Sequence, residues 1–386
     1  MPGRTAMRAT IFQDGPVSPR ESGGEPRACA FPATCCLANG DIVCVYRRGK
    51  EKHSRDGVFV AQRSGDAGRT WSEPVMIFDG LSRPVPESVH GGAVVPAADG
   101  ALLAMFTAVP VREADSYIFS ETGRQLEQIF YVAVSPDSGR TWGEAVPHRP
   151  PGTRPLRYIN SRPLALPDGD LLVPVEITTP ARRQAVMMTR YAPAAGTFAP
   201  AQMLADDESG RLSFGDPKLT RLADGRILMW LWAFLNEGEE TIQAHECVSA
   251  DDGRTWSPPR ATTILCQCAA LLGLPDGSVL AVANVRQPPE GIRLWRSPDG
   301  GRTWNGAAGL QMWDARKFRM LGEPLAGVAA GKSADDGRLW EALPGFTFGT
   351  PDLVASDPGS FLLTYYAVTE GFAQVRACRF GLAPAP

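Results

Sequence analysis

Ser-Gly-Asp-Ala-Gly-Arg-Thr-Trp, residues 64–71, recurs with small changes at 135–142, 249–256 and 297–304. Each copy reads Ser-x-Asp-x-Gly-Arg-Thr-Trp and follows a short apolar run. The Asp can accept hydrogen bonds from nearby backbone N–H groups, the Gly permits a left-handed backbone angle, and the Trp can pack its indole against a sheet. Four copies at the same point of a longer unit therefore indicate a repeat protein, with the octapeptides as structural turns.

The longer unit becomes visible through a second turn, usually Asp-Gly, which occurs six times and precedes an apolar strand each time. These strands are expected at 42–46, 102–107, 171–177, 227–234, 279–285 and 361–367. The turns lie 52 to about 81 residues apart, which suits a four-stranded sheet with loops of variable length. Because no amphipathic helix interrupts this pattern, we predict an all-β chain, a six-bladed β-propeller with residues 1–386 as one domain.

The sixth unit lacks an outer strand after its third strand at 374–380. We expect residues 8–12 to supply it and so to close the ring. Two longer insertions, 106–129 and 305–349, are expected on one rim as a lid or an oligomer contact. The second insertion contains an octapeptide-like stretch at 333–340, which we interpret as chance similarity or a decayed copy.

Composition excludes several classes of protein. The net charge is −3 and no Lys/Arg tract occurs, so neither nucleic acid nor an anionic membrane surface is an expected partner. No run approaches the ~20 apolar residues of a membrane helix, and the first residues are polar, so we expect a cytoplasmic protein. The eight cysteines are expected as buried reduced thiols. Because Cys266 and Cys268 have no second pair or nearby His, we expect no metal and no other cofactor.

Together these turns and the sixfold β repeat resemble the sialidase superfamily, whose turns are known as Asp boxes or BNR repeats. The resemblance covers essentially the whole chain. It implies a carbohydrate or glycoside ligand held by an arginine triad through the sugar carboxylate, a nucleophilic Tyr paired with a Glu, and an Asp as acid/base. Asp boxes also occur in propellers that are not enzymes, so the resemblance is specific for the fold and weak for the chemistry.

Matching these roles residue by residue leaves gaps. Asp56 follows an Arg in the first rim loop, where the superfamily carries its acid/base, and Asp216 stands where the tyrosine-activating Glu is expected. Ala30 replaces the first arginine of the triad, and a second arginine position falls near Trp232. The expected nucleophile position, within 348–351, contains no Tyr, although Tyr365 and Tyr366 end the next strand.

If all the turns lie on one rim, the opposite rim gathers the ionisable residues. We predict Asp56, Asp216 and Glu87 as catalytic carboxylates. The predicted substrate-binding residues are Arg48, His53, His90, Arg162, Lys218, Gln267 and Trp232. Plainer interpretations accompany them: Asp56 precedes a Gly and suits a turn, Arg162 suits an ion pair with Glu176 on the same rim, and Trp232 suits the filling of a blade.

Three hypotheses of function follow from this rim. The first is an exo-acting, sialidase-like glycoside hydrolase that cleaves a sugar or sugar-acid glycoside with carboxylate acid/base catalysis. The second is a carbohydrate-binding propeller without turnover, which would use the same residue types. The third is a protein-interaction scaffold, which would present a flat apolar rim instead of a cluster of ionisable groups.

Overall fold

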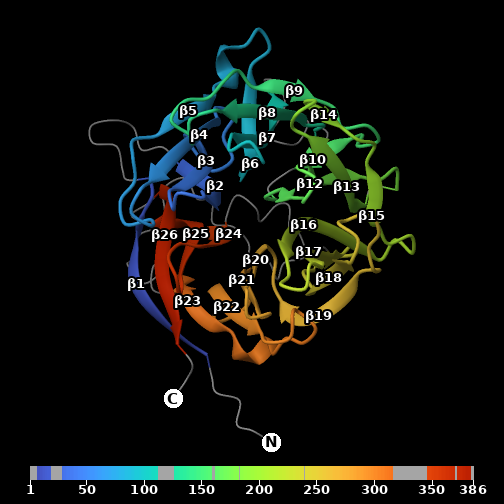
Figure 1. Cartoon of the computed structure of the whole chain (residues 1–386). Coiled ribbons are helices and arrows are strands. Elements are labelled where there is room, and N and C mark those ends of the chain that lie inside the picture. Colours follow the sequence, from blue (N-terminus) through green and yellow to red (C-terminus); the bar gives the residue numbers. More distant parts are fainter. Residues whose placement is uncertain are drawn as a thin grey trace, which may run out of the picture.

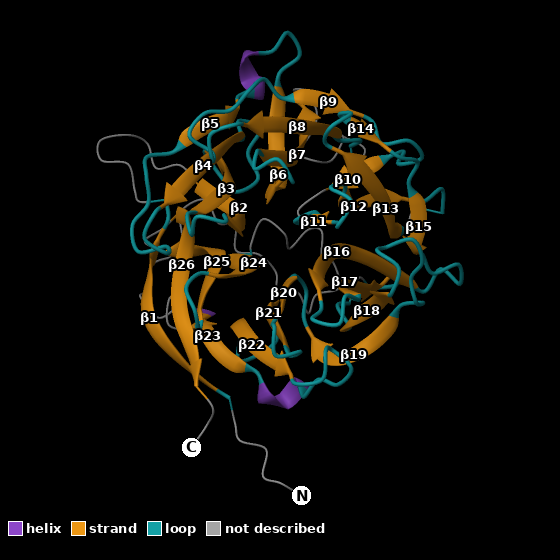
Figure 2. Cartoon of the chain, viewed as in Figure 1, coloured by secondary structure: helices purple, strands orange, loops and turns teal. Residues whose placement is uncertain are grey.

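Six antiparallel sheets surround a common axis like the blades of a propeller (Figure 1). This computed structural model describes residues 7–18, 28–111, 126–158, 161–181, 183–238, 240–315, 346–369 and 372–383. Within these residues strands account for nearly all of the regular structure, and η1 (Gly80–Ser82) and η2 (Gly306–Ala308) are single 3₁₀ turns (Figure 2). The predicted six-bladed, all-β architecture is confirmed.

The strands of each blade run outward from the axis in the order of the chain, except that β1 is the outermost strand of blade 6. Blade 1 contains β2 (Ala28–Cys36), β3 (Ile42–Gly49), β4 (Val58–Ser64) and β5 (Val75–Phe78). Blade 2 contains β6 (Glu87–Pro96), β7 (Leu102–Pro110), β8 (Ile129–Ser135) and β9 (Val146–His148). Blade 3 contains β10 (Leu156–Tyr158), β11 (Leu164–Ala165), β12 (Leu171–Thr178), β13 (Gln184–Ala192), β14 (Thr197–Phe198) and β15 (Gln202–Ala205).

The second half repeats this order. Blade 4 contains β16 (Leu212–Arg221), β17 (Ile227–Leu235), β18 (Gln243–Ser249) and β19 (Arg260–Leu265). Blade 5 contains β20 (Ala269–Gly273), β21 (Val279–Val285), β22 (Gly291–Ser297) and β23 (Leu310–Asp314). Blade 6 contains β24 (Phe348–Ala355), β25 (Ser360–Thr369), β26 (Phe372–Ala383) and, outermost, β1 (Arg8–Pro16). The six predicted apolar strands coincide with β3, β7, β12, β17, β21 and β25.

The N-terminal strand closes the ring, as predicted. β1 pairs antiparallel with β26, so the two ends of the chain lie side by side in one sheet (Figure 1). Asp14 anchors this pairing, because its carboxylate accepts hydrogen bonds from the Tyr365 hydroxyl at 3.1 Å and from Arg376 Nη2 at 2.9 Å. The octapeptide-like stretch at 333–340 and most of the two insertions lie outside the described residues.

The octapeptide turns are hydrogen-bonded around their Asp. In the first copy, Asp66 Oδ1 accepts the Thr70 N–H at 2.9 Å and Oδ2 accepts the Thr70 hydroxyl at 2.6 Å, while Ser64 Oγ accepts the Gly68 N–H at 2.8 Å. Ala67 and Gly68 are consecutive left-handed residues, with φ of 59° and 85°. The Asp–Thr bonds recur in the other three copies.

The glycine of each octapeptide packs against the preceding blade. A Cβ added there would lie between 2.6 and 3.4 Å from an apolar side chain: Gly68 meets Leu362, Gly139 meets Val43, Gly253 meets Leu172, and Gly301 meets Leu228. The turns therefore join neighbouring blades as well as neighbouring strands.

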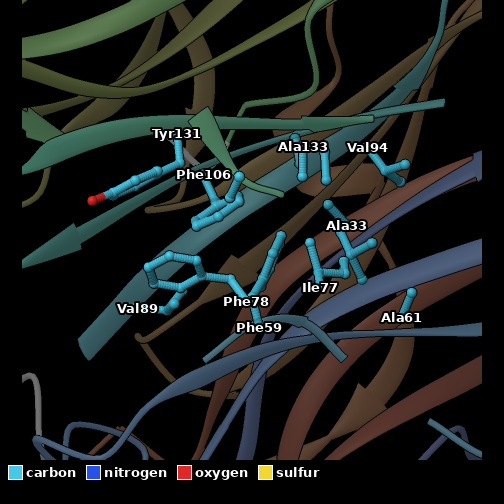
Figure 3. Close-up of a cluster of buried hydrophobic side chains, with 14 of the residues drawn as sticks. Ala33, Phe59, Ala61, Ile77, Phe78, Val89, Val94, Phe106, Tyr131 and Ala133 are labelled. Carbon is cyan, nitrogen blue, oxygen red and sulfur yellow. The ribbon is translucent and has the colours of Figure 1, made fainter. Parts of the chain in front are cut away.

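The hydrophobic core is divided among the six junctions between blades. Between blades 1 and 2, Phe59 lies 4.9 Å from Phe106, and the Phe106 ring stacks on Tyr131 with centroids 5.4 Å apart (Figure 3). The junctions between the other blades contain comparable clusters. Because aromatic and branched side chains fill each wedge, the blades hold one another at fixed angles around the axis.

The contact between Gly253 and Leu172 gives a test of this coupling. We expect Gly253→Ala to lower the free energy of unfolding more than Gly277→Ala, because both glycines are left-handed but only Gly253 has a side chain within reach. Left-handed alanine costs about 1–2 kcal/mol in each variant, and overpacking against Leu172 adds about 1–3 kcal/mol at Gly253 alone. Equal losses in chemical denaturation would contradict this role of the turn.

Candidate functional site

The rim opposite the octapeptide turns contains three kinks in the inner strands. Phe31, Asp216 and Thr350 each precede a proline and have left-handed backbones, with φ of 58°, 45° and 42°. The strand register breaks at all three positions. Non-glycine residues in this conformation are strained and concentrate at functional sites. The kinks therefore mark the end of the axis at which a site is to be sought.

Below the kinks the axis is narrow. The cavity lined by Phe31, Arg162, Lys218 and Thr350 offers about 20 Å³, which suits a water molecule and not a sugar. Arg162 crosses this region: Nη1 donates to Thr34 O at 3.0 Å and Nη2 contacts Asp352 Oδ1 at 3.1 Å. The ion pair of Arg162 is thus with Asp352 of blade 6 and not, as expected, with Glu176.

The end of the axis beside the three kinks is called the mouth from here on. Glu176 of blade 3 and Asp216 of blade 4 contact each other there. The Asp216 N–H donates to Glu176 Oε1 at 3.0 Å, and the Gln184 amide contacts Glu176 Oε2. Burial, followed by the charge of Asp216, raises the pKa of Glu176 to about 8. On blade 5 the Cys268 thiol donates to Asp216 Oδ2 at 2.6 Å. Asp216 is therefore held from both neighbouring blades.

Two cations, Arg286 and Lys52, face the same aromatic side chains. The Arg286 guanidinium lies 4.0 Å from the Phe346 ring centroid, and Lys52 Nζ lies 5.8 Å from the same centroid and 5.3 Å from that of Tyr366. Burial, with the charge of Arg286, lowers the pKa of Lys52 well below its ordinary value. Gln267 holds Arg286, since its Oε1 accepts from Arg286 Nε at 3.1 Å.

Tyr366 reaches the mouth from the second strand of blade 6. A Cβ added to Gly349 would lie 3.0 Å from Arg286 Nη2 and 3.1 Å from the Tyr366 hydroxyl, so the glycine leaves room for both groups. Burial raises the pKa of Tyr366 to about 12, although the charge of Arg286 opposes the shift. Tyr365, which we considered beside it, is buried in the core between blades 5 and 6, and its hydroxyl contacts Asp14 of the outermost strand.

Aromatic rings and two imidazoles form another side of the mouth. The Phe31 ring centroid lies 5.4 Å from that of His53, 6.1 Å from that of His90 and 5.6 Å from that of Tyr366. His90 Nδ1 is 2.7 Å from the Gln128 amide. Burial lowers the pKa of His90 to about 3 despite this hydrogen bond, and it lowers that of His53 well below the ordinary value. Both imidazoles are therefore neutral at neutral pH.

Other predicted site residues have different surroundings. Asp56 Oδ1 accepts the Lys50 N–H of its own loop at 3.0 Å, and its hydrogen bonds with Ser54 and Lys50 lower its pKa even though burial opposes them. Glu87 accepts from the Tyr131 hydroxyl at 2.7 Å. Trp232 is buried against Phe234 and donates to Thr241 at 3.2 Å.

The loop that contains Asp56 is fixed by a buried arginine. Arg47 donates to Val89 O at 2.9 Å, to Glu51 O at 2.7 Å and to Ser54 O. The loop is thereby joined to blade 2. Arg48, the predicted ligand beside it, is half-buried at the end of β3.

Thus the structure brings Asp216, Lys218, Gln267, His53 and His90 around the mouth, whereas Asp56, Glu87, Arg162 and Trp232 contact their own loops, the axis or the blades. Sequence reasoning missed Arg286 and Lys52, and it left Glu176, Tyr366 and Cys268 without a predicted role in catalysis or binding. Gly349 is the signal that could have found Arg286 and Tyr366, because a glycine at a strand kink permits close approach by neighbouring side chains.

Within the described part of the chain, no helix is long and apolar enough to cross a membrane.

Comparison with known proteins agrees with this fold. The family model of the BNR repeat-like domain matches residues 40–320. A protein of unknown function from Dyadobacter fermentans has 20% sequence identity and a TM-score of 0.73, with 97% of this chain and 99% of that chain covered. No curated protein matches the chain.

Two sialidases are also similar in structure. A Hadza microbial sialidase has 16% identity and a TM-score of 0.61, and the Trypanosoma rangeli sialidase has 12% identity and a TM-score of 0.63. The alignments cover 92% and 96% of this chain but only 66% and 59% of the two sialidases. At these identities the likeness concerns the fold alone. The chain belongs to the BNR repeat-like domain family, and it shares its propeller fold with these sialidases.

Proposed function

We propose that this protein is a glycoside hydrolase that cleaves a sugar-acid glycoside at the mouth of the propeller. The observation that carries the proposal is the convergence of a carboxylate, a phenol, a buried ammonium and a half-buried guanidinium from three blades and a rim loop. These groups belong to Asp216, Tyr366, Lys52 and Arg286. Glycoside cleavage needs one group that protonates the leaving oxygen and a second that acts as base or nucleophile. The mouth contains groups of both kinds.

Asp216 and Tyr366 are the proposed reacting pair. Asp216 stands in the sequence position of the tyrosine-activating Glu of sialidases, and its charge acts on the Tyr366 hydroxyl. In the proposed step the Tyr366 oxygen bonds to the anomeric carbon, its proton passes to Asp216, and the bond to the leaving oxygen breaks. Water then attacks the anomeric carbon and breaks the sugar–tyrosine bond. Asp216 returns its proton to the phenol oxygen, and the proton lost by water passes to Asp56, which donated one to the leaving oxygen.

Asp56 remains the proposed donor of the proton to the leaving oxygen, because it lies half-exposed in the rim loop where the superfamily carries its acid. Its pKa is lowered, so a donor role there requires activity that increases toward acidic pH.

Lys52 and Arg286 support a sugar acid over a neutral sugar. Two cations near one aromatic ring repel each other, and an anion placed between them relieves that repulsion. The suppressed pKa of Lys52 agrees with this interpretation, because an arriving carboxylate would favour the charged ammonium.

A carbohydrate-binding propeller without turnover is the second candidate. It is favoured by Ala30, a small apolar residue where sialidases have the first arginine of their triad, and by the Asp56 carboxylate being engaged by its own loop.

Asp216→Asn separates these two candidates. We expect it to abolish product release from aryl glycosides of sugar acids, with a fall of about a hundredfold or more in kcat, while ligand affinity stays within a few fold. Asp99→Asn is the matched control, because Asp99 lies in an Asx turn on the opposite rim and its Oδ1 accepts the Ala101 N–H, which an Asn also permits. Binding without product in the unmodified chain, over a broad glycoside panel, would favour the second candidate.

Proton uptake tests the anion-binding pair. We expect a sugar acid to bind with uptake of protons in the pH range in which Lys52 titrates in the unliganded protein, because a nearby carboxylate favours the charged ammonium, whereas a neutral sugar should bind without uptake. Calorimetric titration in buffers of different ionisation enthalpy measures this number. Lys52→Ala should remove most of the uptake and weaken binding about ten- to a hundredfold. The control Lys50→Ala, two residues away and exposed, should change neither; uptake that persists in Lys52→Ala would contradict the assignment.

A further inference from the structure

Phe346 lies at the mouth and contacts side chains of three other blades. It precedes β24 of blade 6 by two residues. Its ring packs against Trp232 and Phe234 of blade 4, and the Arg286 guanidinium of blade 5 lies 4.0 Å from the ring centroid. Its backbone carbonyl accepts a hydrogen bond at 2.7 Å from Lys52 Nζ, which belongs to the rim loop of blade 1. A residue that contacts blades 4, 5 and 1 from blade 6 lies over the end of the axis and not at the side of one blade.

Phe346 engages both cations to which the proposed function assigns a sugar carboxylate. The Arg286 guanidinium contacts two rings, with the centroids of Phe346 and Phe348 at 4.0 and 4.3 Å. Lys52 Nζ donates to the Phe346 carbonyl oxygen, which carries a partial negative charge, and lies 5.8 Å from the Phe346 ring centroid. Cation–π contacts and a charge-assisted hydrogen bond stabilise a cation that has no anion beside it. The chain therefore supplies partners to both cations from one of its own residues.

The room for a sugar at the mouth is limited by the same residue. The cavity beneath the kinks offers about 20 Å³, which holds a water molecule and not a sugar ring. A sugar beside Asp216 and Tyr366 must therefore lie on the outer side of the kinks, at the end of the axis where Phe346 lies. Lys52 is 8% exposed and donates to the Phe346 carbonyl. A sugar carboxylate that binds Lys52 thus has to take the place of that carbonyl.

We propose that Phe346 is an internal occupant of the sugar-acid site: its carbonyl and ring bind Lys52 and Arg286 in the protein without ligand, and an acidic sugar binds by displacing them. The class of ligand rests on the proposed function, whereas the occupancy of the mouth by Phe346 does not. The displacement lowers the apparent affinity, because only the fraction of molecules with Phe346 withdrawn can bind. It also favours acidic over neutral sugars, since a neutral sugar gives Lys52 no carboxylate in exchange for the carbonyl.

Phe346→Ala tests the competition between this residue and a ligand. We expect it to tighten the binding of D-glucuronate, D-galacturonate or N-acetylneuraminate about tenfold in calorimetric titration, because without its ring the residue no longer contacts Arg286 and Trp232. If Phe346 were a wall on which the sugar stacks, the same variant would bind more weakly. Weaker or unchanged binding overturns the proposal. Phe12→Ala is the control and should leave the affinity unchanged, because Phe12 is 53% exposed on β1.

Acetylation of Lys52 by acetic anhydride tests the occupancy without any ligand. In the unmodified chain the reagent also depends on the fraction of molecules with Phe346 withdrawn, so we expect Phe346→Ala to raise the rate at Lys52 about tenfold. Fragment-ion mass spectrometry separates Lys52 from the exposed Lys50, which should react equally in both chains. Equal rates at Lys52 overturn the occupancy. If neither chain binds a sugar acid, the proposed function fails, and this measurement still decides whether Phe346 covers the mouth.

If Phe346→Ala does not fold, hydrogen exchange in the unmodified chain decides. Thr347 follows Phe346 directly, and its carbonyl oxygen accepts the Val368 N–H at 2.6 Å. Withdrawal of Phe346 from the mouth pulls on this hydrogen bond, so we expect the Val368 amide to exchange faster when a sugar acid is bound. Leu363, in the middle of the same strand, is the reference and should exchange at an unchanged rate. Unchanged or slower exchange at Val368 on binding overturns the proposal.

Discussion

The hydrogen bonds between the Asp and Thr of each octapeptide are the constraint on which the propeller depends. Asp66 Oδ1 and Oδ2 both bind Thr70, and this double contact keeps Ala67 and Gly68 left-handed. Only that conformation presents the glycine to the preceding blade. Since the same hydrogen bonds overcome the opposing effect of burial and lower the pKa of Asp66 to about 2, the turn keeps its charged acceptor far into the acidic range.

Closure of the ring brings the inner strands of the blades together at one axis, and the candidate site lies at one end of that axis. β1 pairs with β26, and the junction cores fix the angle between blades, so the inner strands have no freedom to relax. The three kinks at Phe31, Asp216 and Thr350 persist within this frame, each at a break in strand register. Strain of this kind needs surrounding structure that holds it in place. The blades supply it, and the strained residues meet at one end of the axis.

The sequence predicted the fold well because its signals are local and repeated: the turns and the strands follow from patterns within ten residues. The closing strand follows from the outer strand that the sixth repeat lacks. The mouth was harder to predict. The resemblance to sialidases pointed to inner-strand positions, with Ala30 at the first arginine and residues 348–351 at the nucleophile. Arg286 and Tyr366 instead come from the ends of second strands. Cys268 matched the expected buried thiol, but its bond to Asp216 joins segments 52 residues apart. Such contacts depend on blade angles that no local pattern contains.

This mouth differs from an arginine triad because one of its two cations, Lys52, can lose its charge, whereas arginines stay protonated. Arginines stay charged whether or not a ligand is bound, so a triad carries its mutual repulsion in the empty site. Burial and the charge of Arg286 lower the pKa of Lys52, so loss of its charge costs less in the empty site than it would at an arginine, and an arriving anion would raise that pKa again. Compared with an arginine triad, such a site would bind a carboxylate less tightly, but it would carry less repulsion between its cations when no ligand is bound.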